Sequence, residues 1–279
     1  MAVLGSVAHE GTLKRLFEKN SIDYVFHAAA YKHVSLAEEN PSAAVIANVK
    51  GTKILIDFCE RYRIKKALFY STDKAVNPVS VMGATKKIAE EYIISIAANK
   101  KSQFYVLRLC NIYDSKGSVV PIFRENIQNK EPVTLSHPEA ERMFVDMNTV
   151  LSISLSILEN EKAGSVFLTT NYNILKIRDI ALKLAKEEQM DDVENLIRIG
   201  GLKRGERLHE KLCAPEEKLL QSNLKGVLFI KNGRKINVDL MNKCIQEAEN
   251  CNEEGTINLL KELLPDYRGL NYQRSALDG

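Results

Sequence analysis

The densest group of reactive side chains lies between Ser71 and Lys86, in the segment S-T-D-K-A-V-N-P-V-S-V-M-G-A-T-K. Its hydroxyl, carboxyl and amino groups are the kinds that exchange protons with a bound substrate. The preceding run Lys65–Tyr70 is short and mostly apolar, which predicts a buried strand. The residues from Gly83 to Ala98 carry apolar side chains at helical spacing and predict a helix. Because ligands of open α/β sheets bind outside the carboxyl ends of the strands, we expect a site at this strand-to-helix connection.

The elements that position this site alternate between helix and strand over the first 111 residues. Expected helices cover 9–20, 42–61 and 83–99, and expected strands cover 23–27, 66–71 and 104–109. This αβαβαβ order predicts a parallel sheet with right-handed crossovers. The later pattern is less regular: helices at 119–128, 147–160 and 177–188, short strands at 133–135, 143–145, 165–168 and 226–230, an acidic helix start at Pro215, and two polar-faced helices within 236–264.

Composition and charge argue against several classes of protein. The 279 residues are 45% hydrophobic and 27% charged, which is ordinary for a globular protein with a full core. The net charge is +3, from 39 basic and 36 acidic residues, so there is no broad electrostatic case for a nucleic-acid partner. The sequence has no apolar run of about 18 residues and no signal-peptide pattern. The five cysteines are scattered without a C-x-x-C pair, so we expect reduced thiols, no metal site and a cytoplasmic protein.

Six separate segments resemble one enzyme family. They are H-A-A-A-Y-K-H-V (27–34), S-T-D-K-A-V-N-P (71–78), V-M-G-A-T-K (81–86), G-S-V-V-P-I-F (117–123), T-L-S-H-P-E-A-E-R-M-F (134–144) and L-K-R-G-E-R-L-H-E (202–210). Together they resemble the extended short-chain dehydrogenase/reductase superfamily, and within it the polysaccharide-biosynthesis branch that contains UDP-N-acetylglucosamine 4,6-dehydratases. The resemblance spans about residues 5–235. It implies an α/β fold: a Rossmann-like doubly wound parallel sheet with a smaller C-terminal α+β part that binds the nucleotide sugar.

One departure from that family concerns the cofactor turn. Family members begin with a strand and G-x-x-G-x-x-G, whose glycines let the backbone approach the pyrophosphate of the dinucleotide. This sequence has no such turn, and Ser6 stands where the family usually carries an adenine-contacting Asp. We therefore expect an N-terminally truncated fold. A partial dinucleotide-binding domain would cover 1–111, a mainly substrate-binding part with some segments returning to the sheet 112–265, and a loosely ordered tail 266–279.

The resemblance assigns the acid and the base of the reaction to the first motif. In the family, oxidation at sugar C4 acidifies the C5 hydrogen, and water then leaves from C6. By resemblance, Asp73 is the acid for the departing hydroxyl, Lys74 accepts the C5 proton and Thr72 hydrogen-bonds O4. A lysine base must be neutral when it acts, so we expect burial or a neighbouring cation such as Lys86 to lower the pKa of Lys74. The alternative is that Asp73 and Lys74 form a surface turn.

Met82 stands where most of the superfamily has a catalytic tyrosine. Methionine cannot transfer a proton, but the dehydratase branch with S-T-D-K often carries methionine here, so the resemblance makes Met82 typical of that branch. The alternative is that Met82 only fills space near the sugar ring. By resemblance, Lys86 holds the nicotinamide ribose of NAD or NADP.

Further site residues follow from the same motifs. On the cofactor side they are Ala28, Ala29, Ala30, Asn48, Ser71 and Lys86. On the side of the UDP-sugar substrate they are Lys32, His33, Asn111, Ser118, Val119, Arg142 and Glu206. Ser118 and Val119 begin a helix whose free N–H groups suit an anion, and an arginine forks a phosphate. The alternatives are close packing for the alanines and solvated surface groups for the polar residues. Lys203 and Arg204 stand where the family usually has Arg and Pro.

Two classes of function remain open at this point. The first is an enzyme of surface-polysaccharide biosynthesis, a 4,6-dehydratase acting on a UDP-N-acetylhexosamine, with a C4 or C5 epimerase as the close alternative. Tyrosine at position 82 would favour the epimerase. The second is a non-catalytic remnant or partner subunit that binds the UDP-sugar without a cofactor. Exposure of strand 23–27 as a sheet edge predicts self-association. Family dimers often pair the long helix with the helix of Lys86, so we expect a homodimer.

Overall fold

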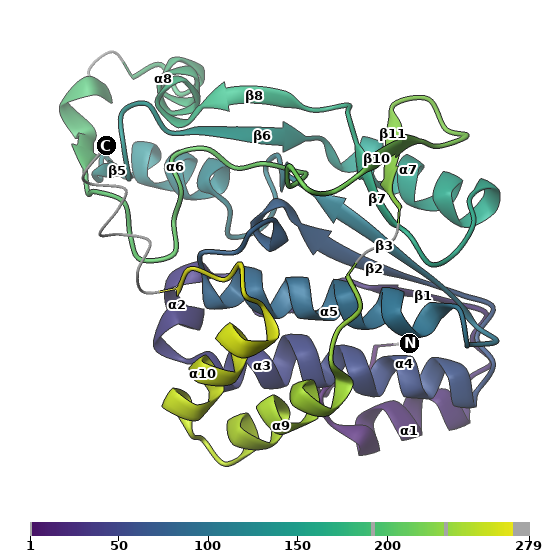
Figure 1. Ribbon diagram of the computed structural model, residues 1–279. Helices are drawn as coiled ribbons and strands as arrows, with labels where there is room; N and C mark the ends of the chain where they lie inside the picture. The colour runs from purple at the N-terminus through teal and green to yellow at the C-terminus, as the bar shows by residue number, and fades with distance from the viewer. Residues whose placement is uncertain (1, 191–192, 232–233, 270–279) are drawn as a thin grey trace.

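A six-stranded sheet forms the centre of the computed structural model, which describes residues 2–190, 193–231 and 234–269 (Figure 1). The strand order is β1-β2-β3-β7-β11-β10. The strands are β1 (Tyr24–His27), β2 (Lys66–Thr72), β3 (Gln103–Leu109), β7 (Val166–Thr169), β11 (Val227–Ile230) and β10 (Leu219–Gln221). The first four run parallel, and β11 and β10 are antiparallel to their neighbours. The carboxyl ends of β1, β2 and β3 therefore meet at one edge of the sheet.

A layer of helices covers one face of this sheet (Figure 1). It consists of α5 (Val81–Ala97) and a continuous helical rod of α3 (Pro41–Val45), the π-helical η1 (Ile46–Lys50) and α4 (Gly51–Arg61). Ser80 begins α5 by accepting a hydrogen bond from the Gly83 N–H at 3.0 Å, and Pro41 occupies the first turn of α3, where its missing N–H costs nothing. α1 (Glu10–Lys19) packs on α4. The apolar core lies between this layer and the sheet.

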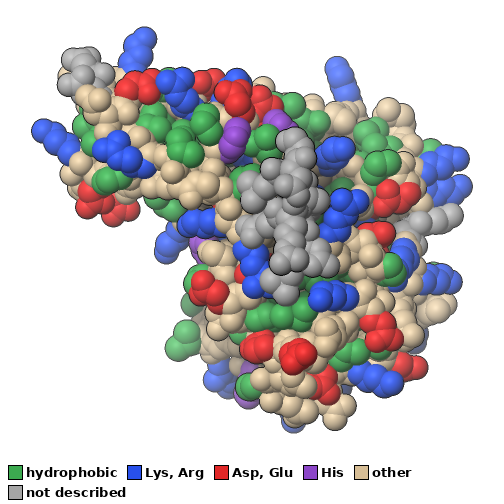
Figure 2. Space-filling model, turned by 60° about the vertical axis from the view of Figure 1, so that its left-hand side comes forward, with side chains coloured by type: hydrophobic (Ala, Val, Ile, Leu, Met, Phe, Trp, Pro, Cys, Tyr) green, Lys and Arg blue, Asp and Glu red, His purple; other side chains and the backbone are tan. Residues whose placement is uncertain are grey.

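The other face of the sheet carries α7 (Met147–Asn160), which lies over β2. The Tyr70 hydroxyl on β2 and the Ser154 hydroxyl on α7 lie 3.0 Å apart. A smaller lobe continues from this side. It contains the sheet of β4 (Asn111–Ile112), β6 (Glu141–Val145) and β8 (Asn173–Lys176), the pair β5 (Val133–Leu135) and β9 (Ile197–Ile199), and the helices α6 (Val119–Gln128) and α8 (Ile177–Glu187). In Figure 2 this lobe projects from the main body, and Lys and Arg side chains lie on the body beneath it.

Most predicted elements appear, with a few differences. The sequence pattern missed the short strands β4 and β8 and the helix α2 (Val34–Glu39). The helix expected from Pro215 is wrong, because residues 215–217 form a turn and a bend and β10 begins at Leu219. The long helix after Pro41 contains the π-helical turn η1, which apolar spacing cannot distinguish from α-helix.

The last two helices lie against the first part of the chain. α9 (Val238–Glu249) packs on α3 and η1, and α10 (Glu253–Leu263) packs on α3 and α5. They therefore occupy part of the face on which the expected homodimer would pair the long helix with the helix of Lys86. Tyr267 is buried in the same core, whereas residues 270–279 of the expected tail lie outside the described residues. Among the described helices, none has the length and hydropathy needed to cross a membrane.

The strand β1 is an edge strand of the main sheet. His27 faces the helix layer and is buried, whereas Tyr24 and Phe26 are 51% and 45% exposed. Parallel sheets are normally covered on both faces, so this exposed aromatic pair is unusual. The edge position of β1 agrees with the sheet edge expected from the sequence, and Tyr24 and Phe26 lie on the face of β1 opposite His27.

Candidate active site

The S-T-D-K motif lies at the carboxyl end of β2. Thr72 is the last strand residue, and Asp73 and Lys74 begin a single 3₁₀ turn, η2 (Asp73–Ala75). Asp73 is fully buried, and its Oδ1 accepts hydrogen bonds from the Thr72 hydroxyl at 2.8 Å and from Lys74 Nζ at 3.0 Å. Its Oδ2 is buried without a hydrogen-bond partner. The surface-turn alternative is therefore wrong, because the Asp73 side chain is buried.

Lys74 is surrounded by acidic side chains. Its Nζ lies 3.0 Å from Asp73 Oδ1 and 3.9 Å from Glu210 Oε1. Burial opposes the charged form, but Asp73 and Glu210 together raise the pKa of Lys74 above its ordinary value. The expectation that Lys86 lowers this pKa is wrong, because the nearest partners are carboxylates. Lys74 is therefore an ammonium ion in this arrangement.

A segment that we call the strap, residues 203–210, crosses this end of the sheet. Gly205 has φ +79°, and a Cβ there would lie 2.8 Å from Ser80 Cβ, so the backbone passes close to the start of α5. Arg204 Nε lies 2.9 Å from the buried Glu38 carboxylate of α2. Arg207 donates hydrogen bonds to the carbonyls of Val76 and Asn77, just after the S-T-D-K motif. These contacts hold the strap over the site.

Arg142 on β6 also binds the strap. Its guanidinium donates hydrogen bonds to the carbonyl oxygens of Leu208 and Arg207, both at 2.8 Å, and to that of Glu141 at 2.7 Å. Arg142 is thus engaged with backbone, and phosphate binding by this residue stays a prediction. Glu206 on the strap accepts a hydrogen bond from the Lys203 N–H at 3.0 Å, which closes its own turn; its expected contact with a ribose also stays a prediction.

Lys86, Ser71 and His27 line a small pocket between the sheet and α5. Lys86 Nζ donates a hydrogen bond to the Tyr70 carbonyl at 2.5 Å, and burial lowers the pKa of Lys86 to about 8. The Ser71 hydroxyl is buried and lies beside the Glu90 carboxylate, whose pKa Arg108, Lys87 and Ser71 together hold below its ordinary value despite burial. Burial, helped by Lys86, lowers the pKa of His27 to about 3, so His27 is neutral. A half-buried amine and a buried hydroxyl therefore lie together beside the motif.

Asn48 lies in the π-helical turn and is 1% exposed. Its Oδ1 accepts from the Tyr31 N–H at 2.8 Å, and its Nδ2 donates to the Tyr31 carbonyl at 3.1 Å and to the Thr85 hydroxyl at 3.0 Å. The solvent-facing alternative for Asn48 is wrong. The residue fixes the backbone just after β1, where Ala28 and Ala29 are exposed and Ala30 is half-buried. The close-packing alternative therefore does not apply to Ala28 and Ala29, because both are exposed.

Several residues predicted for the substrate side also lie near one another. Lys32 Nζ donates to the Lys116 carbonyl at 2.6 Å, and a Cβ on Gly117 would lie 3.7 Å from the exposed His33 ring. Ser118 is the N-cap of α6, and its hydroxyl is unpartnered. Val119 is the first residue of the helix.

Asn111 and Met82 have structural contacts. Asn111 Nδ2 donates to the Met143 carbonyl at 3.1 Å and ties β4 to β6. Met82, in the first turn of α5, is 4% exposed and belongs to the apolar core. Buried packing of Met82 agrees with a space-filling side chain, and methionine has no proton to exchange.

Sequence reasoning missed the partners that hold the motif. Glu210 and Arg207 lie within the segment 202–210 that resembles the family. The residues that they contact near the S-T-D-K motif are about 130 positions earlier in the chain, so local sequence does not identify the contacts. A buried ion cluster was also missed: Arg108 on β3 contacts Glu90 on α5 at 2.7 Å and Glu217 at 2.7 Å. Arg108 lowers the pKa of Glu217 to about 2 despite burial. The cluster joins β3, α5 and the segment after the strap.

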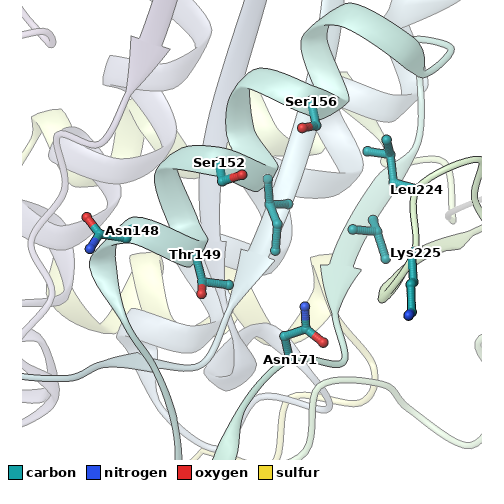
Figure 3. A pocket seen from close by; sticks show the side chains of 9 residues that line it. Asn148, Thr149, Ser152, Ser156, Asn171, Leu224 and Lys225 are labelled. Atoms are coloured by element: carbon teal, nitrogen blue, oxygen red, sulfur yellow. The ribbon is translucent and has the colours of Figure 1, made fainter.

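A groove on the other side of the molecule shows no comparable chemistry. It lies between α7 and the turn at Leu224 and Lys225, and Figure 3 shows hydroxyl and amide side chains along it. The lining includes Ser152, Ser156 and Asn171, and none of the predicted site residues. It offers one lysine and no carboxylate, so it holds no acid–base pair. Among the described residues, no group of His, Cys, Asp and Glu side chains could hold a metal ion.

Comparison with known proteins gives the class. The sequence pattern of the "Polysaccharide biosynthesis protein" family matches residues 1–232. A solved structure, Pen from Bacillus thuringiensis, superposes with a TM-score of 0.76 at 28% identity, over 84% of this chain and 73% of that chain. A dTDP-glucose 4,6-dehydratase from Streptomyces venezuelae superposes with a TM-score of 0.67 at 20% identity, over 73% and 68%, which shows the fold alone. The chain belongs to the polysaccharide-biosynthesis branch of the extended short-chain dehydrogenase/reductases.

Three curated relatives refine this similarity. An "Uncharacterized membrane protein" from Methanocaldococcus jannaschii is 36% identical over 93% of this chain and 80% of its own length. A UDP-N-acetylglucosamine 4,6-dehydratase (inverting) from Campylobacter jejuni is 34% identical over 70% of this chain and 58% of its own length. The capsular polysaccharide biosynthesis protein CapD from Staphylococcus aureus is 38% identical over 69% of this chain and 32% of its own length. This chain thus covers less than two thirds of the length of the two relatives that are named for a function.

Proposed function

We propose that this protein acts on a nucleotide sugar in polysaccharide biosynthesis, as a 4,6-dehydratase of a UDP-N-acetylhexosamine. The observation that carries the proposal is the Asp73–Lys74 pair at the carboxyl end of β2, in which the carboxylate is buried and Nζ lies 3.0 Å from Oδ1. The family membership and the similarity to a named dehydratase support it. In this reaction Lys74 accepts the C5 proton, and Asp73 donates a proton to the C6 hydroxyl, which leaves as water.

The pair can supply both functions with one internal proton transfer. In the arrangement seen, Lys74 is an ammonium ion and Asp73 a carboxylate. Moving a proton from Nζ to Asp73 breaks one N–H bond, forms one O–H bond and leaves the total charge unchanged. It produces a neutral amine and a carboxylic acid, which are the base and the acid that the elimination needs. After elimination the pair is back in the charged form. The Lys74 ammonium, whose protons exchange with solvent, then returns a proton to C5, and the proton released from the C4 hydroxyl on oxidation restores the pair.

The residues present suit the nicotinamide-ribose end of a dinucleotide. Lys86 offers a half-buried amine and Ser71 a buried hydroxyl beside it, and Ala28 and Ala29 leave the backbone after β1 open. A bound NAD or NADP would accept hydride from C4 and return it at C6. The printed sequence has no glycine turn for the pyrophosphate, so we assign no residue to that part.

Ligand binding and isotope incorporation test the proposal. Calorimetry with NAD, NADP and UDP-N-acetylglucosamine separately should show binding of the sugar and of one dinucleotide. Turnover in D₂O should place deuterium at C5 of a 6-deoxy-4-keto product. D73N and K74M should each reduce turnover by about 10²–10⁴-fold, the usual contribution of a general acid or base, with sugar affinity changed far less. Turnover that inverts C4 or C5 without loss of water would instead identify an epimerase.

A non-catalytic UDP-sugar-binding subunit is the second candidate function. Binding of UDP-N-acetylglucosamine with no detectable binding of either dinucleotide would support this candidate and contradict the enzyme proposal for this chain. The same calorimetric titrations therefore distinguish the two.

A further inference from the structure

Glu210 is a buried carboxylate for which the proposed reaction provides no function. Its side chain is 3% exposed. Oε1 lies 3.9 Å from Lys74 Nζ, and Oε2 lies 3.7 Å from Arg207 Nη1 without a hydrogen-bond partner. A carboxylate is costly to bury unless a charged partner stabilises it. Two cations therefore lie near Glu210: Lys74 of the S-T-D-K motif and Arg207 of the strap.

The groups around Lys74 come from four parts of the fold. Asp73 adjoins it in η2, and Glu210 reaches it from the strap. The Arg142 guanidinium on β6 opposes the Lys74 charge. The Cys110 thiol follows β3. Burial, together with the charge of Asp73, raises the pKa of Cys110 to about 12, although Lys74 opposes this effect, so the thiol is neutral. The carboxylates outnumber the cation that opposes them, and Glu210 is the one supplied by a distant segment.

We propose that Glu210 is a positioning residue that holds Lys74 as an ammonium ion and thereby sets how the proton is shared between Lys74 and Asp73. This inference rests on the proposed function for its catalytic meaning, although the proton balance is a property of the chain alone. A negative charge beside Nζ favours the charged pair over the neutral amine and carboxylic acid. The strap therefore controls the base through one charge, and its contacts at Arg204, Gly205 and Arg207 keep that charge in place.

Competitive labelling of the chain's lysines with acetic anhydride tests this without cofactor or sugar. Only the neutral amine reacts, and Lys74 is accessible because its side chain is 22% exposed. Mass spectrometry of the peptide that contains Lys74, across a range of pH, gives its apparent pKa. In E210Q this pKa should fall by about one to three units, the usual effect of an opposite charge within 4–6 Å. E139Q is the matched control, because Glu139 pairs with Lys176 on the surface.

The conservative variant E210D separates charge from packing. It keeps the carboxylate but withdraws it by one methylene, so the pKa of Lys74 should lie between those of wild type and E210Q. A purely structural role would lower the melting temperature of both variants and leave the Lys74 titration unchanged. An unchanged titration in E210Q, or in E210D should E210Q not fold, overturns the proposal.

The enzymatic measurement is independent of the labelling. If the chain turns over, the basic limb of kcat in E210Q should move to lower pH, since the Lys74–Asp73 pair loses its shared proton to solvent at lower pH. Turnover together with an unchanged Lys74 titration would leave the dehydratase proposal standing and remove Glu210 from it. A shifted titration in a chain without turnover would establish the role of Glu210 and contradict the enzyme proposal.

Discussion

Burial shifts the pKa values of individual side chains in this site, and His27 is the simplest case. It lies in the core between β1 and α4, where its Nε2 is 3.0 Å from the Thr52 hydroxyl. The Thr52 hydroxyl donates to the Asn48 carbonyl at 2.7 Å, so Nε2 is the donor to Thr52. The pKa of His27 is lowered to about 3, first by burial and then by Lys86.

His27 should make the protein less stable in acid. The unfolded chain binds a proton at His27 below about pH 6.5, and the folded chain does so only near pH 3. Stability from this group is complete above about pH 6.5 and falls as the pH drops through that window, by up to about 1.4 kcal/mol per unit. Urea denaturation at pH 7, 6, 5 and 4 should show this loss. H27Q should show a flatter pH dependence than wild type; equal slopes would contradict the assignment.

Asn48 should be the most sensitive amide of the site. N48A leaves the Tyr31 N–H without its acceptor and removes the contact with Thr85, so we expect a loss of about 1–3 kcal/mol. Chemical denaturation measures it, with N99A as the control because Asn99 is exposed. A loss in N48A no larger than in N99A would mean that the π-helical turn does not depend on these hydrogen bonds.

At the scale of the elements, the position of the strap depends on Gly205. Gly205 and Gly201 both have φ +79°, but a Cβ at Gly205 meets Ser80 Cβ at 2.8 Å, whereas a Cβ at Gly201 meets nothing within 4 Å. G201A should therefore cost only backbone strain, about 1 kcal/mol. G205A should cost more and weaken sugar binding, because the strap must move from α5. Melting temperatures and calorimetry compare the two; equal effects would mean that the strap does not need this close approach.

The elements also show where sequence reasoning succeeds and fails. Asp73 and Lys74 were predicted because strand, turn and helix follow one another within some thirty residues. Glu210 could not be assigned to Lys74, because nothing local to residues 202–210 identifies the surface on which they dock. Arg142 was expected at a phosphate because its guanidinium is a good anion ligand, yet backbone carbonyls of the strap already use its donors. Packing of α9 and α10 on α3 likewise depends on contacts some 200 residues apart.

At the scale of the whole molecule, the open edge at β1 is the feature most relevant to assembly. Self-association remains a prediction, and Tyr24 and Phe26 are its exposed aromatic residues. Sedimentation velocity at increasing concentration should show larger species for wild type. F26K should shift the distribution towards monomer, because a lysine at a sheet edge opposes pairing. L151K is a control on the neighbouring helix α7, where Leu151 is 52% exposed. A monodisperse wild-type monomer would contradict the prediction.

The contact between α3 and the end of the chain bears on how the protein is made. The Ser42 N–H donates to Glu253 at 2.8 Å, and the Ser42 and Thr256 hydroxyls lie 3.3 Å apart. Chains grow at about 5–20 residues per second, so α3 emerges from the ribosome some tens of seconds before its partner α10 exists. During that interval the apolar surface of α3 is uncovered on the nascent chain. The helix layer beneath the site can therefore be completed only after α10 has been synthesised, and until then the surface of α3 that α10 will cover is open to other contacts, such as those of a chaperone.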